Sequence, residues 1–367
     1  MDKLEGRATR VTSSEYMWWA KTRSHARYNL ATSGLGNYAL AGLPVRLEDL
    51  ELSGPSTYGY MPLQEALAEK CGVEASSVVA AIGTSMANHL AMAALVEPGD
   101  EVLIERPAYE LLISTAQYLG ASIVRFERRF EDGFNLDPAL IESRLSERTR
   151  LIVLTNLHNP SGALADESAL RRVGQLAREV GARVLVDEVY LDAMFEKSPP
   201  SAFKLGQEFV VTGSLTKVYG LSGLRCGWIL AEPLLASRMW RLNDLFGVIP
   251  AHSAERLSVI ALKHLSLVAA RARSLLTENG RQLSSFLESR DDLEARPHEY
   301  GTVSFPRLKT GSVERLSALL AEKYETSVVP GRFFEMPQHF RIGIGGESAM
   351  VAEGLRRLGL ALDELRS

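Results

Sequence analysis

The middle of the chain alternates short apolar runs with longer segments of helical periodicity. Seven of these runs predict strands, at residues 78–81, 101–104, 122–126, 151–154, 183–186, 209–212 and 226–230. Several are apolar at every position, which is typical of strands buried on both faces of a sheet. Between most of them lie segments such as 167–179, where Leu170, Val173 and Leu176 share one helical face. The alternation predicts an α/β fold with a mainly parallel seven-stranded sheet covered by helices.

The C-terminal third follows a different pattern. Residues 254–289 have helical periodicity, with only Gly280 as a potential interruption. Strand-like pieces at 301–305 and 340–344 then flank a helical segment at 313–324. This pattern predicts a long connecting helix followed by a smaller α+β domain.

The length of 367 residues suits two or three domains. We expect residues 1–45 to form an N-terminal arm that belongs to the small domain. Residues 46–255 would form the large α/β domain, and residues 256–367 the connecting helix and the small C-terminal domain.

Composition and charge exclude several classes of protein. Hydrophobic residues make up 46% of the chain and charged residues 23%, which is close to a globular average and excludes a disordered or collagen-like chain. The 41 basic and 45 acidic side chains give a net charge of -4, too even for a surface that coats nucleic acid. We therefore expect no nucleic-acid partner.

The cysteines and the apolar runs bear on metal binding and on the compartment. Cys71 and Cys226 form neither a CxxC pair nor a four-ligand zinc site, so the sequence predicts no metal site. Free thiols suit a reducing cytoplasm. No apolar run approaches the ~20 residues that a membrane span needs, and the charged segment 1–7 lacks the apolar core of a secretion signal. We expect a cytoplasmic protein without membrane contact.

Polar residues at the carboxyl ends of the predicted strands form the candidate site, because open α/β sheets bind ligands at that edge. After the first strand, Gly83, Thr84 and Ser85 precede a helical pattern. Free backbone N–H groups, two hydroxyls and the positive end of a helix dipole suit an anion. The alternative is that the hydroxyls serve only as helix caps.

Three further strands are followed by residues that carry chemistry. After the fourth comes the tight-turn sequence Asn159-Pro160-Ser161-Gly162. Asp187 extends the fifth apolar run, where a buried carboxylate needs a cationic partner, and Tyr190 follows it. After the sixth strand, Lys217 lies in a loop rich in Ser, Gly and Thr, which suits a nucleophilic amine. A surface lysine is the alternative there.

Taken together, these segments resemble the class I/II aminotransferases. Asn159-Pro160-Ser161-Gly162, Asp187-Glu188-Val189-Tyr190 and Ser214-Leu215-Thr216-Lys217, with Arg225 eight residues on, have the family's order and approximate spacing. The resemblance runs from about Tyr58 to Arg341. It implies a pyridoxal 5'-phosphate enzyme of fold type I, in the aspartate aminotransferase superfamily, whose large domain binds the cofactor. Such an enzyme of amino acid metabolism moves the amino group of an L-amino acid to a 2-oxo acid by a ping-pong mechanism.

The resemblance also implies the catalytic residues, which would be Lys217, Asp187 and Tyr190. Lys217 would form the Schiff base with the cofactor and later move a proton at the substrate α-carbon. Asp187 would keep the pyridinium nitrogen protonated, so that the ring accepts electrons. Tyr190 and Asn159 would donate to the 3-oxygen of the ring, and Tyr109 would stack on the ring face.

The remaining cofactor contacts would hold the phosphate. The resemblance places five residues in this phosphate cup: Gly83, Thr84, Ser85, Ser214 and Arg225. Tyr58, or Tyr60 in its place, would reach the phosphate of a neighbouring subunit. That contact implies a homodimer with shared active sites.

On the substrate side, Arg341 would hold the α-carboxylate by a planar two-point contact, beside Asn159. Gly34 would lie over the bound substrate. Six N-terminal residues either line the substrate pocket or belong to an ordinary helix packed on the core, and both alternatives stay open. They are Tyr16, Trp18, Trp19, Lys21, Arg23 and Arg27.

Other reactions stay open because a fold does not fix a reaction. The main alternative is a pyridoxal-phosphate-dependent carbon–sulfur β-lyase or another fold type I amino acid enzyme. A non-catalytic, pyridoxal-phosphate-binding regulator fits less well. The about 45 residues before the sheet are too few and too mixed in charge for the DNA-binding domain of such a regulator.

Overall fold

The computed structural model describes residues 11, 13–55 and 57–366. Its central element is a seven-stranded sheet with the strand order β2-β8-β7-β6-β5-β3-β4. The strands are β2 (Val78–Ile82), β3 (Glu101–Arg106), β4 (Ser122–Glu127), β5 (Thr149–Thr155), β6 (Arg183–Asp187), β7 (Phe209–Ser214) and β8 (Cys226–Leu230). β8 runs antiparallel to β2 and β7, and the other pairings are parallel. The predicted α/β fold with a mainly parallel seven-stranded sheet is confirmed.

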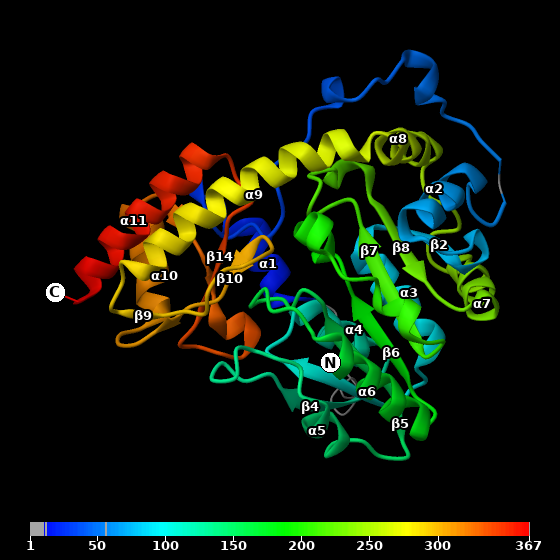
Figure 1. The fold of residues 1–367 in the computed structure, drawn as a ribbon, viewed down its shortest axis with the longest axis horizontal. Coiled ribbons are helices and arrows are strands. Elements are labelled where there is room, and N and C mark those ends of the chain that lie inside the picture. The colour runs from blue at the N-terminus through cyan, green and yellow to red at the C-terminus, as the bar shows by residue number, and fades with distance from the viewer. Residues whose placement is uncertain (1–10, 12, 56, 367) are drawn as a thin grey trace, which may run out of the picture.

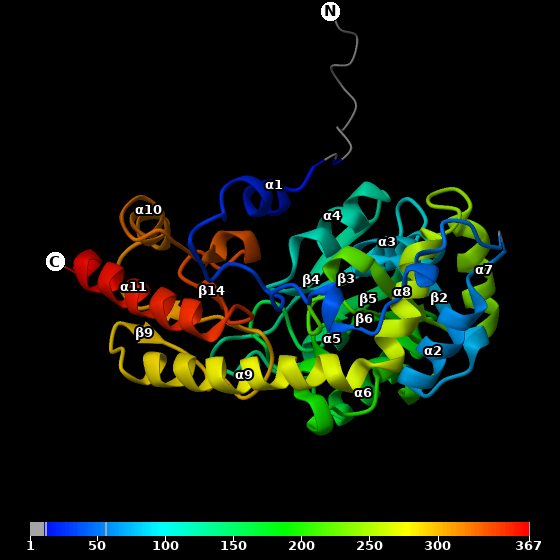
Figure 2. The same cartoon turned by 90° about the horizontal axis from the view of Figure 1, so that it is seen from above.

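Helices cover both faces of this sheet. α3 (Gly83–Leu95) packs on β7 and β8 with α4 (Glu110–Tyr118) beside it, whereas α6 (Glu167–Glu179) packs on β6 from the other side (Figure 2). The middle strands are therefore shielded from water, and residues 151–154 and 184–186 are fully buried. Three further helices border the sheet: α2 (Met61–Cys71), α5 (Pro138–Glu142) and α7 (Pro233–Asn243).

The prediction of one continuous connecting helix is wrong, because the segment forms two helices. α8 (His252–Lys263) and α9 (Leu265–Glu288) meet at His264, where φ is −112° and ψ is 24°. Gly280 lies inside α9 and does not interrupt it. α8 packs on α2 and β8, whereas α9 packs on α11 (Ser348–Arg366), so the two helices follow different surfaces (Figure 1).

The C-terminal strands form a small α+β unit that includes part of the N-terminal arm. β10 (Val303–Ser304) and β13 (Val329–Pro330) pair antiparallel with β14 (Phe340–Gly343), and α10 (Val313–Lys323) packs on α11. β1 (Tyr28–Asn29) of the arm pairs in parallel with β12 (Thr326–Ser327). Two further short strands, β9 (Leu293–Glu294) and β11 (Arg307–Leu308), pair antiparallel. The domain limits at residues 45 and 255 stay a prediction.

α1 (Glu15–Thr22) lies between this small unit and α4 (Figures 1 and 2). The side chain of Tyr16, in this helix, is buried and packs in an aromatic cluster with Phe334 and Phe305. α1 therefore belongs to the packed body of the protein. Among the described residues, no helix is both long and apolar enough to cross a bilayer.

Candidate active site

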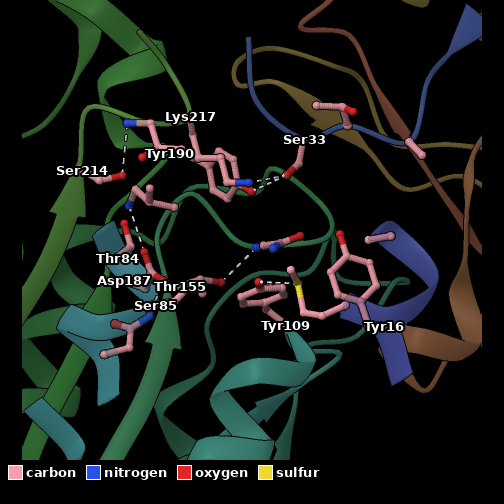
Figure 3. A pocket seen from close by; sticks show the side chains of 18 of the residues that line it. Tyr16, Ser33, Thr84, Ser85, Tyr109, Thr155, Asp187, Tyr190, Ser214 and Lys217 are labelled. Carbon is pink, nitrogen blue, oxygen red and sulfur yellow. Dashed lines mark hydrogen bonds between the residues drawn. The ribbon is translucent and has the colours of Figure 1, made fainter. Parts of the chain in front are cut away.

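A pocket of about 300 Å³ lies at the carboxyl ends of β5, β6 and β7. Thr155, Asp187 and Ser214 are the last residues of these strands, and all three line it. Because β8 runs in the opposite direction, its first residue lies at the same edge, and Arg225 just before β8 also lines the pocket. Side chains of α1 form the facing wall (Figure 3). The pocket is therefore at the edge of the sheet that the sequence predicts.

Asp187 is a buried acid held by two hydrogen bonds. The Asn88 Nδ2 group donates to Asp187 Oδ2 over 2.8 Å, and the N–H of Val189 donates to Oδ1 over 3.0 Å. The Thr212 hydroxyl donates to Asn88 Oδ1 over 2.6 Å, which fixes the orientation of that amide. Burial raises the pKa of Asp187 to about 6, although these hydrogen bonds act in the opposite direction. A cation in the pocket would stabilise the ionised carboxylate.

Lys217 and Tyr190 meet at one hydroxyl group. Lys217 Nζ donates to Ser33 Oγ over 3.2 Å, and the Tyr190 hydroxyl donates to the same oxygen over 2.8 Å (Figure 3). Burial lowers the pKa of Lys217 and raises that of Tyr190. A lysine with a lowered pKa has a larger fraction of neutral, nucleophilic amine at physiological pH.

The predicted phosphate cup surrounds the first turn of α3. Four of its residues line the pocket: Thr84, Ser85, Ser214 and Arg225. Gly83 has a φ of +74°, and a β-carbon there would overlap the Arg225 guanidinium, so only glycine lets the helix N-terminus and this cation approach. The hydroxyls of Thr84 and Thr216 are buried, and no described residue is their hydrogen-bond partner. Such orphaned groups fit a bound oxyanion.

Tyr109 and Asn159 line the pocket between the sheet and α1. The Tyr109 hydroxyl donates weakly to Met17 Sδ over 3.5 Å. The backbone N–H of Asn159 donates to Thr155 Oγ1 over 2.9 Å, which fixes the turn that follows β5. Asn159 Oδ1 accepts a hydrogen bond from Arg341 Nη1 over 2.9 Å. Asn159 therefore connects the pocket to the predicted carboxylate-binding arginine.

The structure places Arg341 behind the pocket wall. Its side chain is completely buried and donates to Asn159 Oδ1, to the Tyr16 hydroxyl over 2.9 Å and to the Ala31 carbonyl over 3.1 Å. Asn159, Tyr16 and Ala31 line the pocket, whereas Arg341 is not one of the described residues that line it. The two-point contact between Arg341 and a substrate stays a prediction.

Gly34 also lies outside the lining and packs against Lys217. A β-carbon at position 34 would lie 3.1 Å from Lys217 Cδ, and the N–H of Leu35 donates to the Lys217 carbonyl over 2.7 Å. The loop that the sequence places over the substrate therefore covers the stem of the lysine. A side chain at position 34 would require Lys217 to shift by a few tenths of an ångström.

Tyr58 is exposed and does not line this pocket of its own chain. It is 55% exposed, and its hydroxyl donates to Asp244 Oδ2 over 3.0 Å. Tyr60, its alternative, packs edge to face on His252 with ring centroids 4.9 Å apart. The contact of Tyr58 with a neighbouring subunit stays a prediction.

Two of the six N-terminal candidates, Tyr16 and Trp19, line the pocket together with Met17. Trp19 also packs on Phe333, with ring centroids 5.3 Å apart. α1 is therefore both a pocket wall and a helix packed on the core. The other four candidates are exposed: Trp18, Lys21, Arg23 and Arg27.

The sequence analysis did not single out Asn88, Ser33 or Thr155 as site residues. Asn88 had a detectable signal, because it is the one polar side chain among the buried residues of helix α3. Ser33 and Thr155 had none. Their partners, such as Tyr190 for Ser33, are distant in sequence, and only the folded chain brings them together.

The fold and the pocket define a class, the fold type I pyridoxal-phosphate enzymes, and comparisons with known proteins agree. The sequence profile of the family described as Aminotransferase class I and II matches residues 49–358. The chain is 31% identical to the capreomycidine synthase of Streptomyces vinaceus over 352 residues, which are 92% of this chain and 90% of that protein. It is 26% identical to a probable aspartate/prephenate aminotransferase of Aquifex aeolicus (strain VF5), over 84% of this chain and 82% of that one.

A solved structure gives the same result for the fold. A pyridoxal-phosphate-dependent aminotransferase from Streptococcus suis 89-1591 has a TM-score of 0.88 and 26% sequence identity, and the match covers 95% of this chain and 96% of that one. The chain belongs to the class I and II aminotransferases. It is a pyridoxal-phosphate-dependent transferase, as the sequence predicts.

The residues of the pocket fit this cofactor. The unpartnered hydroxyls of Thr84 and Thr216, beside the Arg225 guanidinium, suit its phosphate. The carboxylate of Asp187 suits a protonated ring nitrogen, because the pocket otherwise disfavours its charge. The amine of Lys217 suits the aldehyde carbon.

Proposed function

We propose that this aminotransferase moves the amino group of an L-amino acid to a 2-oxo acid in two half-reactions, with Lys217, Asp187 and Tyr190 as catalytic residues. The observation that carries the proposal is a lysine with a lowered pKa in the same pocket as a buried aspartate. Transamination needs an amine that moves a proton at the substrate α-carbon. It also needs a carboxylate that keeps the cofactor ring protonated.

Each pocket residue then has a task toward the cofactor. When bound, pyridoxal phosphate supplies an aldehyde that takes up the amino group and a ring that accepts electrons from the α-carbon. The amine of Lys217 would hold the cofactor at its aldehyde carbon, Asp187 would pair with the ring nitrogen, and Tyr109 would cover the ring face. Tyr190 and Asn159 would donate to the 3-oxygen. The residues that would hold the phosphate are Gly83, Thr84, Ser85, Ser214 and Arg225.

Lys217 would have a second task as the base at the substrate α-carbon. Lys217 Nζ donates a hydrogen bond to Ser33 Oγ, and the Tyr190 hydroxyl donates to the same oxygen and so fixes its position. Burial lowers the pKa of Lys217, so the amine accepts a proton from the α-carbon more readily at neutral pH than an exposed amine would. The same group returns the proton to complete the transfer.

We also propose that the enzyme is a homodimer with shared active sites. Apolar side chains are exposed in the segments 47–55, 57–61 and 245–248, which we call the interface segments: Leu47 82%, Leu52 84%, Met61 55%, Leu245 78% and Val248 55%. The hydrogen bond from Tyr58 to Asp244 links one of these segments to the residue that precedes another. Exposed apolar side chains that gather on a surface are typical of a protein interface. A second copy seated there would bring its Tyr58 to the partner's phosphate cup.

A cytoplasmic location is the final part of the proposal. Both cysteines have free thiols, with Cys71 half-buried and Cys226 buried. Reduced thiols suit a reducing compartment. Cell fractionation with an antibody to the protein tests this point, and recovery in the membrane or secreted fraction would contradict it.

A second function is favoured by one observation, the 31% identity to a capreomycidine synthase. That protein is named for the synthesis of a product and not for amino transfer. The same lysine and aspartate would support another reaction at the α- or β-carbon of an amino acid. Transamination remains the better supported function, because the family match covers residues 49–358.

Steady-state kinetics distinguish these functions. With a transaminase, product forms only when an amino acid and a 2-oxo acid are both present, and double-reciprocal plots for the two substrates are parallel. A β-lyase releases ammonia and pyruvate from a β-substituted amino acid and needs no oxo acid. A synthase gives a new amino acid product, detected by mass spectrometry, from a single substrate.

A further inference from the structure

One buried hydroxyl connects two of the proposed catalytic residues. Ser33 is 5% exposed and lines the pocket. Its Oγ accepts a hydrogen bond from Lys217 Nζ over 3.2 Å and another from the Tyr190 hydroxyl over 2.8 Å (Figure 3). In the described part of the chain, no other side chain hydrogen-bonds to Nζ. The position of the Lys217 amine therefore depends on this serine.

The loop that carries Ser33 is fixed by both parts of the molecule. From the small unit, the hydroxyl of Thr302 donates to the Ser33 carbonyl over 2.6 Å, and Thr302 is itself 0% exposed. From the large sheet side, the Lys217 carbonyl accepts a hydrogen bond from the N–H of Leu35 over 2.7 Å. The Ser33 hydroxyl is thus a rigidly supported acceptor, which restricts the flexible lysine to few positions.

The same hydrogen bonds leave the lone pair of the amine free. A hydroxyl oxygen has two lone pairs, and Tyr190 and Lys217 occupy both on Ser33. When Tyr190 donates to a ligand, the bond between the two hydroxyls can run in the other direction, because each hydroxyl both donates and accepts. In either direction Ser33 accepts from the lysine nitrogen and does not donate to it. The amine is held while its lone pair stays available.

We propose that Ser33 is a positioning residue that holds the Lys217 amine for proton transfer at the substrate α-carbon. The proposal rests on the proposed function in one respect, because it assumes that Lys217 is the base. Since the Ser33 hydroxyl contacts the amine through one hydrogen bond, its loss should affect proton transfer much more than ligand binding.

Exchange of the α-proton of L-phenylalanine in deuterium oxide, followed by NMR with the holoenzyme, measures this step. We expect Ser33→Ala to slow the exchange about tenfold or more, because an untethered amine spends less time in the reactive position. Ser33→Thr keeps the hydroxyl and should retain most of the rate. Ser258→Ala is the matched control, since Ser258 is a buried serine of α8 that does not line the pocket. Any reaction that begins with removal of the α-proton gives this exchange, so failure of transamination leaves the test intact.

Binding of α-methyl-L-phenylalanine separates positioning from folding. This analogue has no α-proton, but its amino group can still take the place of the Lys217 amine, which changes the cofactor absorbance. Ser33→Ala should bind it as tightly as the parent and should keep the parent's unfolding temperature. If this binding is lost in Ser33→Ala, the serine serves ligand binding or folding, and the proposal is wrong. It is also wrong if Ser33→Ala exchanges the α-proton at the rate of the parent.

A second readout uses the cofactor-free protein. Burial is the main cause of the lowered pKa of Lys217. The other groups that act on this pKa are Tyr16 and Asp187, which raise it, and Arg341 and Arg225, which lower it. Ser33→Ala leaves them all in place but removes an acceptor that favours the charged amine. The pKa of Lys217, obtained from the pH dependence of its reductive methylation by formaldehyde, should therefore fall further. An unchanged pKa would contradict the contact between Ser33 and the amine.

Discussion

Lys217 and Asp187 are the two residues on which the proposed chemistry depends. Burial lowers the pKa of the lysine, and it raises the pKa of the aspartate, whose carboxylate is held in place by hydrogen bonds. Neither residue stabilises the cofactor-free protein in its ionised form, because burial of a charged group has an unfavourable desolvation free energy. Pyridoxal phosphate explains both residues, because its aldehyde carbon is an electrophile for Lys217 and its protonated ring nitrogen is a cation for Asp187.

Borohydride reduction of the holoenzyme should attach the cofactor to Lys217. Peptide mapping by mass spectrometry would locate the adduct, and an adduct on another lysine would refute the site. Lys217→Ala should retain the phosphate contacts and bind the cofactor non-covalently. Its turnover should fall by about 10³-fold or more, because one residue supplies both the attachment and the proton transfer.

Asp187→Asn should keep the fold but reduce kcat by about 10²–10³-fold, because an amide does not stabilise a protonated ring nitrogen. The cofactor-free protein also gives a pH dependence. Burial raises the pKa of Asp187 to about 6, so below that pH a proton competes with the cofactor for the carboxylate. Cofactor binding should therefore tighten as pH rises through about 6, by at most about tenfold per unit.

Titration of the cofactor-free parent and of Asp187→Asn at several pH values checks this expectation. The difference between the two proteins isolates Asp187 and the ring nitrogen that it would face, because the phosphate of the cofactor ionises in the same way with both. If the parent and the variant show the same pH dependence, Asp187 does not face the ring nitrogen.

At the scale of elements, α1 is docked by a side chain from another part of the chain. Glu110, the first residue of α4, accepts hydrogen bonds from the Ser14 hydroxyl over 2.7 Å and from the backbone N–H groups of Glu15 and Tyr16 over 3.1 and 2.7 Å. A carboxylate at a helix N-terminus satisfies free N–H groups and interacts favourably with the helix dipole. Glu110 follows Tyr109 directly, so the residue that anchors α1 is next in sequence to a residue that lines the pocket.

Glu110→Ala should loosen α1 without unfolding the sheet. Hydrogen exchange should accelerate in residues 15–22 and remain unchanged in β5 and β6. The KM for amino acids should rise roughly tenfold with a smaller effect on kcat, because Tyr16 is no longer held in place. Glu69→Ala, at an exposed position of α2, is the control. Normal exchange in α1 of Glu110→Ala would contradict the anchoring role.

The central strands and the position of Asp187 and Lys217 in the pocket were predictable from the sequence, because their signals are local. Strands such as β5 and β6 are apolar at successive positions, and the motifs around Asp187 and Lys217 directly follow strands. The break between α8 and α9 at His264 was not predictable, because helical periodicity continues on both sides of it. The role of α1 was left open for a related reason: its anchor, Glu110, lies 94–96 residues further along the chain.

At the scale of the whole molecule, the proposed dimer is tested at the interface segments. Leu245→Glu places a charge at a position that is 78% exposed in the single chain, and it should convert a dimer into monomers in sedimentation velocity. Activity should fall with dimer content, because Tyr58 would act across the interface. Leu234→Glu is the matched control at another exposed position, 71% exposed and outside the interface segments. A fully active monomer would contradict the shared site.

The most direct test of the account is a single turnover with an ¹⁵N-labelled amino acid and no oxo acid. A transaminase releases one 2-oxo acid per active site and stops, with the labelled nitrogen retained on the enzyme-bound cofactor. Addition of a second oxo acid should then release the label as a new amino acid, and Lys217→Ala should block both steps. Release of the label as ammonia, or continued turnover without an oxo acid, would contradict the proposed function.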